Sequence, residues 1–339
     1  MARFLGFGTA LPEHVVTPEE SLAALATLWP RLGRAAPEPV TRHIAQPLEE
    51  VLSPRSLGER MRAYKEIAPG LALEAAREAL GAAKVDAADL DLVISVSCTG
   101  YMVPSLDVRL AAEMGMRADI LRLPLTELGC SGGGAAVAIA HRHLAADPGG
   151  LVLLVAVELC SATFQAQDPS LDNLTAAMVF GDGAAAAVLG GGEGPGLSVT
   201  GAASRLLPAS ERLLGFELGD GGFHPVLDRR LARLIEARLG EAVDAFAPPE
   251  QRGFWAVHAA GPRIFDAIET SLRLPPGALD VSRQTFRRYG NLSSASLLFV
   301  MKALPHEARG QGLALAFGPG VTIEMAALRR CPGGTGPDL

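Results

Sequence analysis

Short apolar runs along the chain alternate with longer segments in which apolar residues recur every three or four positions. Strands covered by helices on both faces read as uninterrupted apolar runs, so the alternation is typical of a layered α/β fold. Such runs predict three buried strands, at 92–96, 151–157 and 254–257. Helical spacing in Ala- and Leu-rich stretches predicts four helices, at 69–80, 132–144, 227–239 and 263–272.

The pattern repeats weakly between the two halves of the chain. The first and the last of these strands are each followed by small polar residues, a proline and a helix. The spacing from Cys98 to Cys130 is 32 residues, and the spacing from His258 to Asn291 is 33. A register that is nearly preserved indicates two related halves packed about a pseudo-dyad. In that arrangement Cys130 and Asn291 each lie at a helix start and face a shared centre.

The boundaries of the two halves follow from glycine-rich stretches. A chain of 339 residues is long enough for two halves with a large buried core. The segment 190–196 is the clearest predicted linker. We therefore predict an N-terminal half over 1–195, a C-terminal half over 196–329 and a flexible tail over 330–339.

Composition narrows the class of protein. Apolar residues make up 49% of the chain and charged residues 20%, which excludes disorder for most of it. A formal net charge of −7 disfavours a nucleic-acid binder. The run 151–157 is too short to span a membrane, and no apolar stretch of signal-peptide length precedes Pro12. We therefore expect a cytoplasmic α/β enzyme.

Cysteine and histidine spacing gives no sign of a metal site. His141 and His143 lie two residues apart, so they do not share a helix face. The chain also lacks a G-x-G-x-x-G loop after a strand, so a bound dinucleotide is not expected. The four cysteines are Cys98, Cys130, Cys160 and Cys331. None of them forms the Cys-x-x-Cys pair of a zinc site, and their spacing does not indicate a disulfide framework.

Cys130, His258 and Asn291 are the candidates for covalent chemistry. Cys130 precedes three glycines and an Ala-rich helix, and a helix amino terminus favours thiolate over thiol. His258 ends an apolar strand and precedes a Gly-Pro turn, a position suited to a cleft. Taken singly, an inert buried cysteine, a hydrogen-bonded core histidine and an Asn helix cap are ordinary alternatives. Together the three supply a nucleophile, a base and a polarising donor.

Six segments carry a resemblance to a known family: Val96–Ser105, Leu128–Gly133, Phe180–Ala185, the strand end at His258, Tyr289–Ser294 and Phe317–Gly320. Over residues 1–329 the chain resembles the type III polyketide synthases, the chalcone-synthase-like branch of the thiolase superfamily, and 98–105 is more similar to bacterial members. The Gly-Pro-Gly at 318–320 separates this group from β-ketoacyl-ACP synthase III, which has a similar Cys, His and Asn set. The resemblance implies a five-layered α-β-α-β-α thiolase fold that is usually homodimeric.

The resemblance also implies roles for individual residues. Cys130 matches the nucleophile that accepts the starter acyl group from CoA. His258 and Asn291 match the pair that binds the malonyl thioester carbonyl and drives decarboxylation. Phe180 and Phe223 match two aromatic gatekeepers between the CoA tunnel and the cavity. The implied substrates are acyl-CoA and malonyl-CoA, with no metal or redox cofactor.

Other positions implied by the resemblance line the cavity or contact CoA. Val103 falls where a side chain reaches toward the partner subunit's cavity, and Gly318 and Pro319 belong to the loop that shapes the cavity wall. The remaining cavity positions are Cys98, Cys160 and Ser293. The expected contacts of the CoA phosphates are basic residues: Arg55, Arg60, Arg62, Lys65 and Arg263.

Two other functions remain open at this point. A single-round condensing or acyl-transfer relative such as β-ketoacyl-ACP synthase III would add only one malonyl-derived unit. A catalytically silent CoA- or acyl-binding protein could use the same fold, although the complete set of Cys130, His258 and Asn291 argues against it. Alkylpyrone, alkylresorcinol and tetrahydroxynaphthalene products are all compatible with the motifs.

Overall fold

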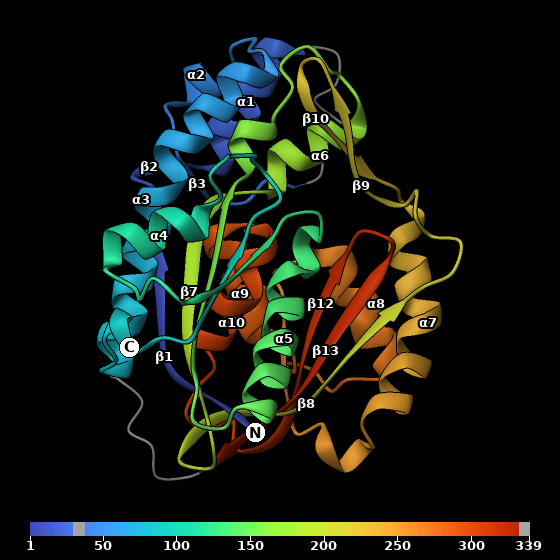
Figure 1. Ribbon diagram of the computed structural model, residues 1–339. Helices are drawn as coiled ribbons and strands as arrows, with labels where there is room; N and C mark the ends of the chain where they lie inside the picture. The colour runs from blue at the N-terminus through green and yellow to red at the C-terminus, as the bar shows by residue number, and fades with distance from the viewer. Residues whose placement is uncertain (30–37, 332–339) are drawn as a thin grey trace.

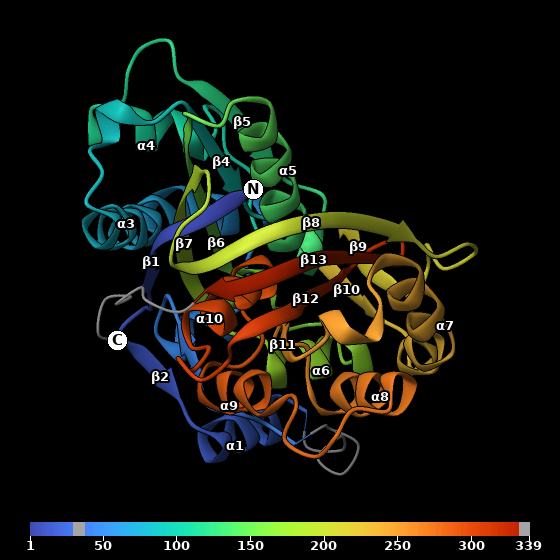
Figure 2. The same ribbon diagram turned by 90° about the horizontal axis from the view of Figure 1, so that it is seen from below.

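A continuous nine-stranded sheet forms the centre of the computed structural model, which describes residues 1–29 and 38–331. The strand order is β11-β12-β13-β8-β1-β7-β6-β4-β5. The register joins β1 to β8 through two residue pairs only, so the sheet consists of two smaller sheets that meet there (Figure 2). The strands are β1 (Ala2–Ala10), β4 (Leu92–Val96), β5 (Leu121–Leu125), β6 (Leu151–Leu159), β7 (Asp182–Gly191), β8 (Gly196–Leu206), β11 (Phe254–Val257), β12 (Gly310–Gly318) and β13 (Thr322–Cys331).

The two smaller sheets have the same internal order. In the first half the order is β1-β7-β6-β4, and in the second it is β8-β13-β12-β11. β4 pairs with β6 in parallel, as β11 does with β12, and the remaining pairs in each set are antiparallel. A helix precedes the corresponding strands β6 and β12: α5 (Gly132–Ala146) and α10 (Ser296–Lys302). This correspondence is the pseudo-dyad that the sequence repeat predicts.

Helices complete five layers around the two sheets (Figures 1 and 2). α3 (Leu57–Ala83) and α4 (Leu106–Met114) cover one outer face, α5 and α10 lie between the sheets, and α7 (Arg230–Phe246) and α8 (Pro262–Leu272) cover the other outer face. β4 shows how one strand serves two layers. Its Leu92 and Ile94 belong to the core around α5, whereas Val93 belongs to the core around α3.

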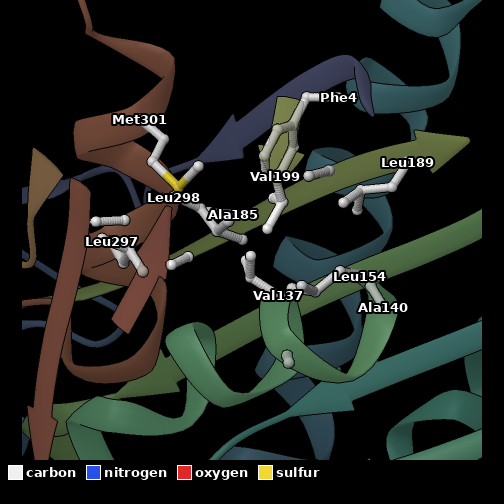
Figure 3. Close-up of a cluster of buried hydrophobic side chains, with 14 of the residues drawn as sticks. Phe4, Val137, Ala140, Leu154, Ala185, Leu189, Val199, Leu297, Leu298 and Met301 are labelled. Atoms are coloured by element: carbon white, nitrogen blue, oxygen red, sulfur yellow. The ribbon is translucent and has the colours of Figure 1, made fainter. Parts of the chain in front are cut away.

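Small side chains let the central layer pack closely. A Cβ added to Gly133 at the start of α5 would lie 2.2 Å from the carbonyl oxygen of Ser294, so the segments after Cys130 and Asn291 are in direct contact. Figure 3 shows α5, α10 and strands of both halves meeting in one apolar cluster. The labelled side chains are Phe4, Val137, Ala140, Leu154, Ala185, Leu189, Val199, Leu297, Leu298 and Met301.

Several short elements form a cap over one end of the layers, at the top of Figure 1. The cap has small apolar cores of its own, one of which is built on Val16, Ile44, Val51 and Phe164. Its elements are α1 (Pro18–Leu28), α2 (Leu48–Val51), α6 (Leu171–Val179), the antiparallel pair of β2 (His14–Val16) and β3 (Arg42–Ile44), and the hairpin of β9 (Leu214–Gly219) with β10 (Gly222–Leu227). The other elements are α9 (Asp280–Tyr289) and the 3-10 turns η1 (Ala87–Asp89), η2 (Gly129–Ser131), η3 (Cys160–Thr163), η4 (Pro249–Gln251) and η5 (Ser293–Ala295).

All three predicted strands and all four predicted helices are present; β4 and β11 have the predicted limits, and the other elements differ at one or both ends. The prediction that a helix begins at 69 was wrong, because α3 begins at Leu57 behind a capping box of Ser56 and Glu59, and Pro69 lies inside it. α7 begins after the predicted position 227 and extends beyond 239 to Phe246. No helix in 1–29 or 38–331 is long and apolar enough to cross a membrane.

The predicted linker and tail are also corrected. The stretch 190–196 connects the halves, yet only 192–195 lies outside β7 and β8. Gly192 and Gly196 have φ of +97° and +98°, which allows the tight turn between these strands. Arg330 and Cys331 belong to β13 rather than to a flexible tail, and the rest of the predicted tail lies outside the described residues.

Candidate active site

Strand ends and helix starts from both halves carry the three predicted catalytic residues, and a side-chain hydrogen bond joins Asn291 to Cys130. Cys130 lies in η2, immediately before α5. His258 directly follows β11, and its backbone N–H donates to Leu315 O at 3.0 Å. Asn291 lies just before η5 and is joined to the end of α6, because its N–H donates to Val179 O at 2.7 Å. The backbone therefore fixes each residue independently of its side chain.

The turn that carries Cys130 packs tightly against the loop 318–320. Gly129 has a φ of +54°, and a Cβ there would lie 2.6 Å from Pro319. A Cβ on Gly318 would lie 2.2 Å from Ser131 Oγ. Only glycine fits at both positions, so Gly318 and Pro319 form a wall directly behind the cysteine turn.

Hydrogen bonds fix which end of the Asn291 amide faces the cysteine. Its Oδ1 accepts from Ser293 N–H at 2.8 Å and from Ser296 Oγ at 3.2 Å. Nδ2 is therefore the end that donates toward Cys130. The Oδ1 of Asn291 thus binds the first N–H of the 3-10 turn, whose N-cap residue is Leu292, and Nδ2 still presents a donor to the site.

Ser293 lies between two thiols. It hydrogen-bonds to Cys130, and its Oγ lies 3.2 Å from Cys98 Sγ. Its φ of +48° is unusual for a residue other than glycine. A strained residue held between two sulfur atoms is typical of a functional site rather than of a plain turn.

Burial dominates the protonation of Cys130 and His258. It raises the pKa of Cys130 to about 11, against hydrogen bonds from Ser293 and Asn291 that lower it. Burial also lowers the pKa of His258 to about 4. Burial therefore acts against the helix start, which favours thiolate. Phe317 N–H donates to Nδ1 of His258 at 3.4 Å, which assigns the proton of the neutral ring to Nε2.

A fully buried carboxyl, Glu158 at the end of β6, is a site residue that the sequence reasoning missed. It accepts hydrogen bonds from Thr99 Oγ1 at 2.7 Å, from Ser294 Oγ and from Cys98 N at 3.1 Å. Burial raises its pKa, and those hydrogen bonds act in the opposite direction. Its charge raises the pKa of Cys130 as well. In the sequence, the one sign of this site residue is that an acidic residue directly follows the apolar run 151–157.

The predicted cavity residues occupy different environments. Phe180 ends α6 and bridges to Asn291, and Phe223 of β10 packs against Phe216 with ring centroids 5.6 Å apart. Cys160 is buried at the start of η3. Val103 is 66% exposed, so it does not line the cavity of its own chain.

The predicted CoA contacts differ in their exposure. Arg62 and Lys65 are exposed on α3 and Arg263 is exposed on α8, two helices that lie on different sides of the molecule (Figures 1 and 2). Arg55 is half-buried and donates to Gln46 Oε1 at 2.6 Å. The prediction that Arg60 contacts a CoA phosphate was wrong, because its side chain is buried and donates to two backbone carbonyls.

Comparisons with known proteins agree with this geometry. Family models described as chalcone and stilbene synthases match the chain over residues 42–193 for the N-terminal domain and 198–332 for the C-terminal domain. The chain belongs to the chalcone and stilbene synthase family. The predicted family and enzyme class, a type III polyketide synthase, are thereby confirmed.

Several named synthases of this family are similar to the chain over nearly their whole length. The 1,3,6,8-tetrahydroxynaphthalene synthase of Streptomyces peucetius subsp. caesius is 39% identical over 95% of this chain and 91% of the relative. The phloroglucinol synthase of Pseudomonas fluorescens is 31% identical over 93% and 95%. The crystal structure of tetrahydroxynaphthalene synthase from Streptomyces coelicolor A3(2) superposes with a TM-score of 0.92 at 34% identity, over 98% of this chain and 100% of that one. The superposition confirms the predicted five-layered fold.

Proposed function

We propose that the enzyme builds a polyketide on Cys130 from malonyl-CoA by repeated decarboxylative condensation. The observation that carries the proposal is the orientation of Asn291, whose Oδ1 is occupied by Ser293 and Ser296 while Nδ2 faces Cys130. A donor fixed in this way beside a nucleophile suits a thioester oxygen that becomes negative during reaction.

The steps follow from thioester chemistry. Cys130 attacks the thioester carbonyl of the starter, the bond from the carbonyl carbon to the CoA sulfur breaks, and CoA leaves after taking a proton. Malonyl-CoA then loses CO₂, and the electron pair of the broken C–C bond moves onto the thioester oxygen as an enolate. Nδ2 of Asn291 and Nε2 of His258 donate to that oxygen. The enolate carbon attacks the acyl group on Cys130, and the cysteine sulfur leaves. The extended chain is now a CoA thioester, and Cys130 takes it back by attacking that carbonyl, with CoA leaving after it gains a proton, so that the next round can begin.

These steps need neither a metal nor a redox cofactor, because the thioester and the carboxylate supply the driving force. The alternatives of a single-round condensing enzyme and of a silent binding protein are less well supported. The full-length similarity to tetrahydroxynaphthalene and phloroglucinol synthases favours repeated condensation with an aromatic product.

We propose 1,3,6,8-tetrahydroxynaphthalene as the product, on the similarity to enzymes of that name. Its ten ring carbons require five malonyl-CoA molecules, which release five CO₂, five CoA and one water. No other starter is then needed. Phloroglucinol is the second candidate, because its six ring carbons need three malonyl units and a synthase of that product is also similar.

The test is incubation with malonyl-CoA alone, followed by mass spectrometry of the products and of released CoA. Tetrahydroxynaphthalene, with five CoA per product, is the expected result, and trihydroxybenzene with three CoA would select the second candidate. An enzyme that makes neither, but extends an added acyl-CoA, would contradict the malonyl starter. Failure to condense any pair of CoA thioesters would contradict the proposed function itself.

We also propose that two chains associate. Exposed apolar side chains follow the parallel strands β4 and β5 at the same end: Tyr101, Val103 and Leu128. Leu121 on the edge strand β5 is 58% exposed. Large apolar side chains left exposed along a sheet edge and beside it are typical of a protein interface. Analytical ultracentrifugation should give twice the chain mass for the wild type and the single-chain mass for Leu121→Arg, and a monomeric wild type would contradict the proposal.

A further inference from the structure

A buried arginine binds the turn between β9 and β10. Phe223 follows this turn, at the start of β10. Arg60 of α3 is 1% exposed, and its Nε donates to Gly221 O at 3.0 Å. Its Nη1 donates at 3.0 Å to Ala162 O, which lies in η3 two residues after Cys160. One guanidinium therefore links the segment that carries Phe223 to the segment that carries Cys160.

Gln165 makes a second link between the same two segments. Its side-chain Nε2 donates to Phe223 O at 3.2 Å and to Thr163 O at 3.0 Å. The buried Asn173 of α6 in turn fixes Gln165, because Asn173 Oδ1 accepts from Gln165 N at 3.1 Å and Asn173 Nδ2 donates to Gln165 O at 2.8 Å. The network therefore joins the backbone of Phe223 to α6, the helix that ends immediately before Phe180.

The turn is shaped to lie directly on these two side chains. Gly222 has a φ of +132°, and a Cβ there would lie 2.9 Å from Gln165 Nε2 and 3.1 Å from Arg60 Cδ. Any larger residue would push the turn and Phe223 away from α3. The contact between the turn and α3 therefore depends on Arg60, Gln165 and Gly222, which lie far apart in sequence.

A guanidinium held only by carbonyl groups is an expensive way to stabilise a fold. Burial lowers the pKa of Arg60 to about 10, and the positive charge of Arg55 lowers it further. The group still carries its charge at neutral pH, and neither of its carbonyl partners carries a formal charge. An apolar side chain of similar volume would pack there without that desolvation cost. Directional hydrogen bonds, in contrast, fix the relative position of two backbone segments.

That position matters because β10 and η3 both border a narrow pocket beside Phe180. The lining of this pocket includes Phe180, Cys160, Thr163 and Pro225 of β10. A shift of β10 relative to η3 therefore changes the volume of the pocket. Arg60 and Gln165 bridge the two elements that bound it.

We propose that Arg60 and Gln165 are positioning residues that set the place of Phe223 relative to η3, and thereby the passage of CoA thioesters and the length of the product. The inference rests on the proposed function and on the gatekeeper role that the family resemblance implies for Phe223. It assigns Arg60 a role inside the protein rather than at a CoA phosphate.

The test uses Gln165→Met and Arg60→Met, which keep most of the volume and remove the donors, with Arg60→Lys as the conservative variant. Arg77→Gln, an exposed change on the same helix, is the matched control. Loss of one hydrogen bond is worth about 1 kcal/mol, so we expect kcat/KM for malonyl-CoA to fall about fivefold to tenfold in Gln165→Met and further in Arg60→Met. The loss should appear mainly in KM and in a higher ratio of short to full-length products, with partial recovery in Arg60→Lys.

Hydrogen exchange separates positioning from simple loss of stability. Faster exchange confined to residues 214–227 and 160–165 is expected, with unchanged exchange in the central sheet. Should Arg60→Met fail to fold, Gln165→Met carries the test alone. Wild-type KM and product ratio in folded Gln165→Met would overturn the inference, even if its melting temperature falls. A wild-type enzyme that condenses nothing would instead contradict the proposed function.

Discussion

Replacing Asn291 should separate decarboxylation from acyl loading. Asn291→Asp keeps an oxygen that accepts from Ser293 N–H and from Ser296, and it replaces the Nδ2 donor with an acceptor. Removing one donor to a developing oxyanion lowers a rate about 10²–10³-fold, or about 2.7–4 kcal/mol. We expect malonyl-CoA decarboxylation to fall by that factor with little change in stability.

Asn291→Ala provides the comparison. It removes the same donor but also leaves the buried N–H of Ser293 without its acceptor. An orphaned buried N–H costs about 1–3 kcal/mol, so the free energy of unfolding should fall by that amount in this variant alone. The two variants should therefore lose decarboxylation similarly and differ in stability.

The assay is release of labelled CO₂ from malonyl-CoA, with acylation of Cys130 by a starter acyl-CoA followed by mass spectrometry on the same samples. Acylation by Asn291→Ala should fall much less than decarboxylation, because the enolate oxygen forms only when malonyl-CoA loses CO₂. Near-normal CO₂ release by either variant would refute the assignment of Asn291.

Three further predictions concern pH and charge. Burial lowers the pKa of His258 to about 4, so the ring should stay neutral as the pH falls through 6.5 and the decarboxylation rate should not drop there. A drop in rate centred near pH 6.5 that disappears in His258→Gln would contradict a neutral ring. Burial raises the pKa of Asp182 from 3.8 to about 6, against hydrogen bonds from Ser161 and Ala45, so the folded state binds this proton more tightly than the unfolded state. The contribution of Asp182 to the free energy of unfolding should therefore fall by up to about 3 kcal/mol between pH 4 and 6, and urea melts of Asp182→Asn should lack that slope. Arg263→Gln should raise KM for malonyl-CoA more than it lowers kcat and weaken the salt dependence of KM, whereas identical salt curves for Arg263→Gln and the exposed control Arg273→Gln would exclude Arg263 from CoA binding.

The sequence predicts best those elements that are apolar at nearly every position, because such elements are buried on both faces. β4 is apolar at nearly every position and is wholly buried, so its limits match the prediction. The first part of α3 was missed because residues 58–66 are largely polar and Pro69 resembles a helix start. The capping box of Ser56 and Glu59 was the signal that could have placed its beginning.

The residues of the candidate site likewise fall into those that a local sequence pattern predicts and those that it does not. Cys130, His258 and Asn291 were predicted because each follows a local pattern of strand end, glycine or helix start. Glu158 and Arg60 were missed or misassigned because their roles depend on partners far away in sequence. Arg60 meets Gly221 and Ala162 across 161 and 102 residues, and no local pattern distinguishes it from a basic residue on the surface.

The chemistry of the four cysteines separates the nucleophile from its neighbours. Burial, followed by the charge of Glu158, raises the pKa of Cys98 well above its usual value, and the same two causes act on Cys160. Cys331 lies at the end of β13 and follows no helix start. Cys130 alone combines the turn before α5 with hydrogen bonds from Ser293 and Asn291. The central claim is therefore that the starter acyl group is attached to Cys130.

Peptide mass spectrometry of the enzyme trapped with an acyl-CoA starter tests that claim most directly. In the wild type, the acyl adduct is expected on the peptide that contains Cys130. Cys130→Ala should lose both the adduct and all polyketide. Cys98→Ala should keep the adduct and change at most the pattern of products. A stable acyl adduct on Cys98 that survives in Cys130→Ala would contradict it.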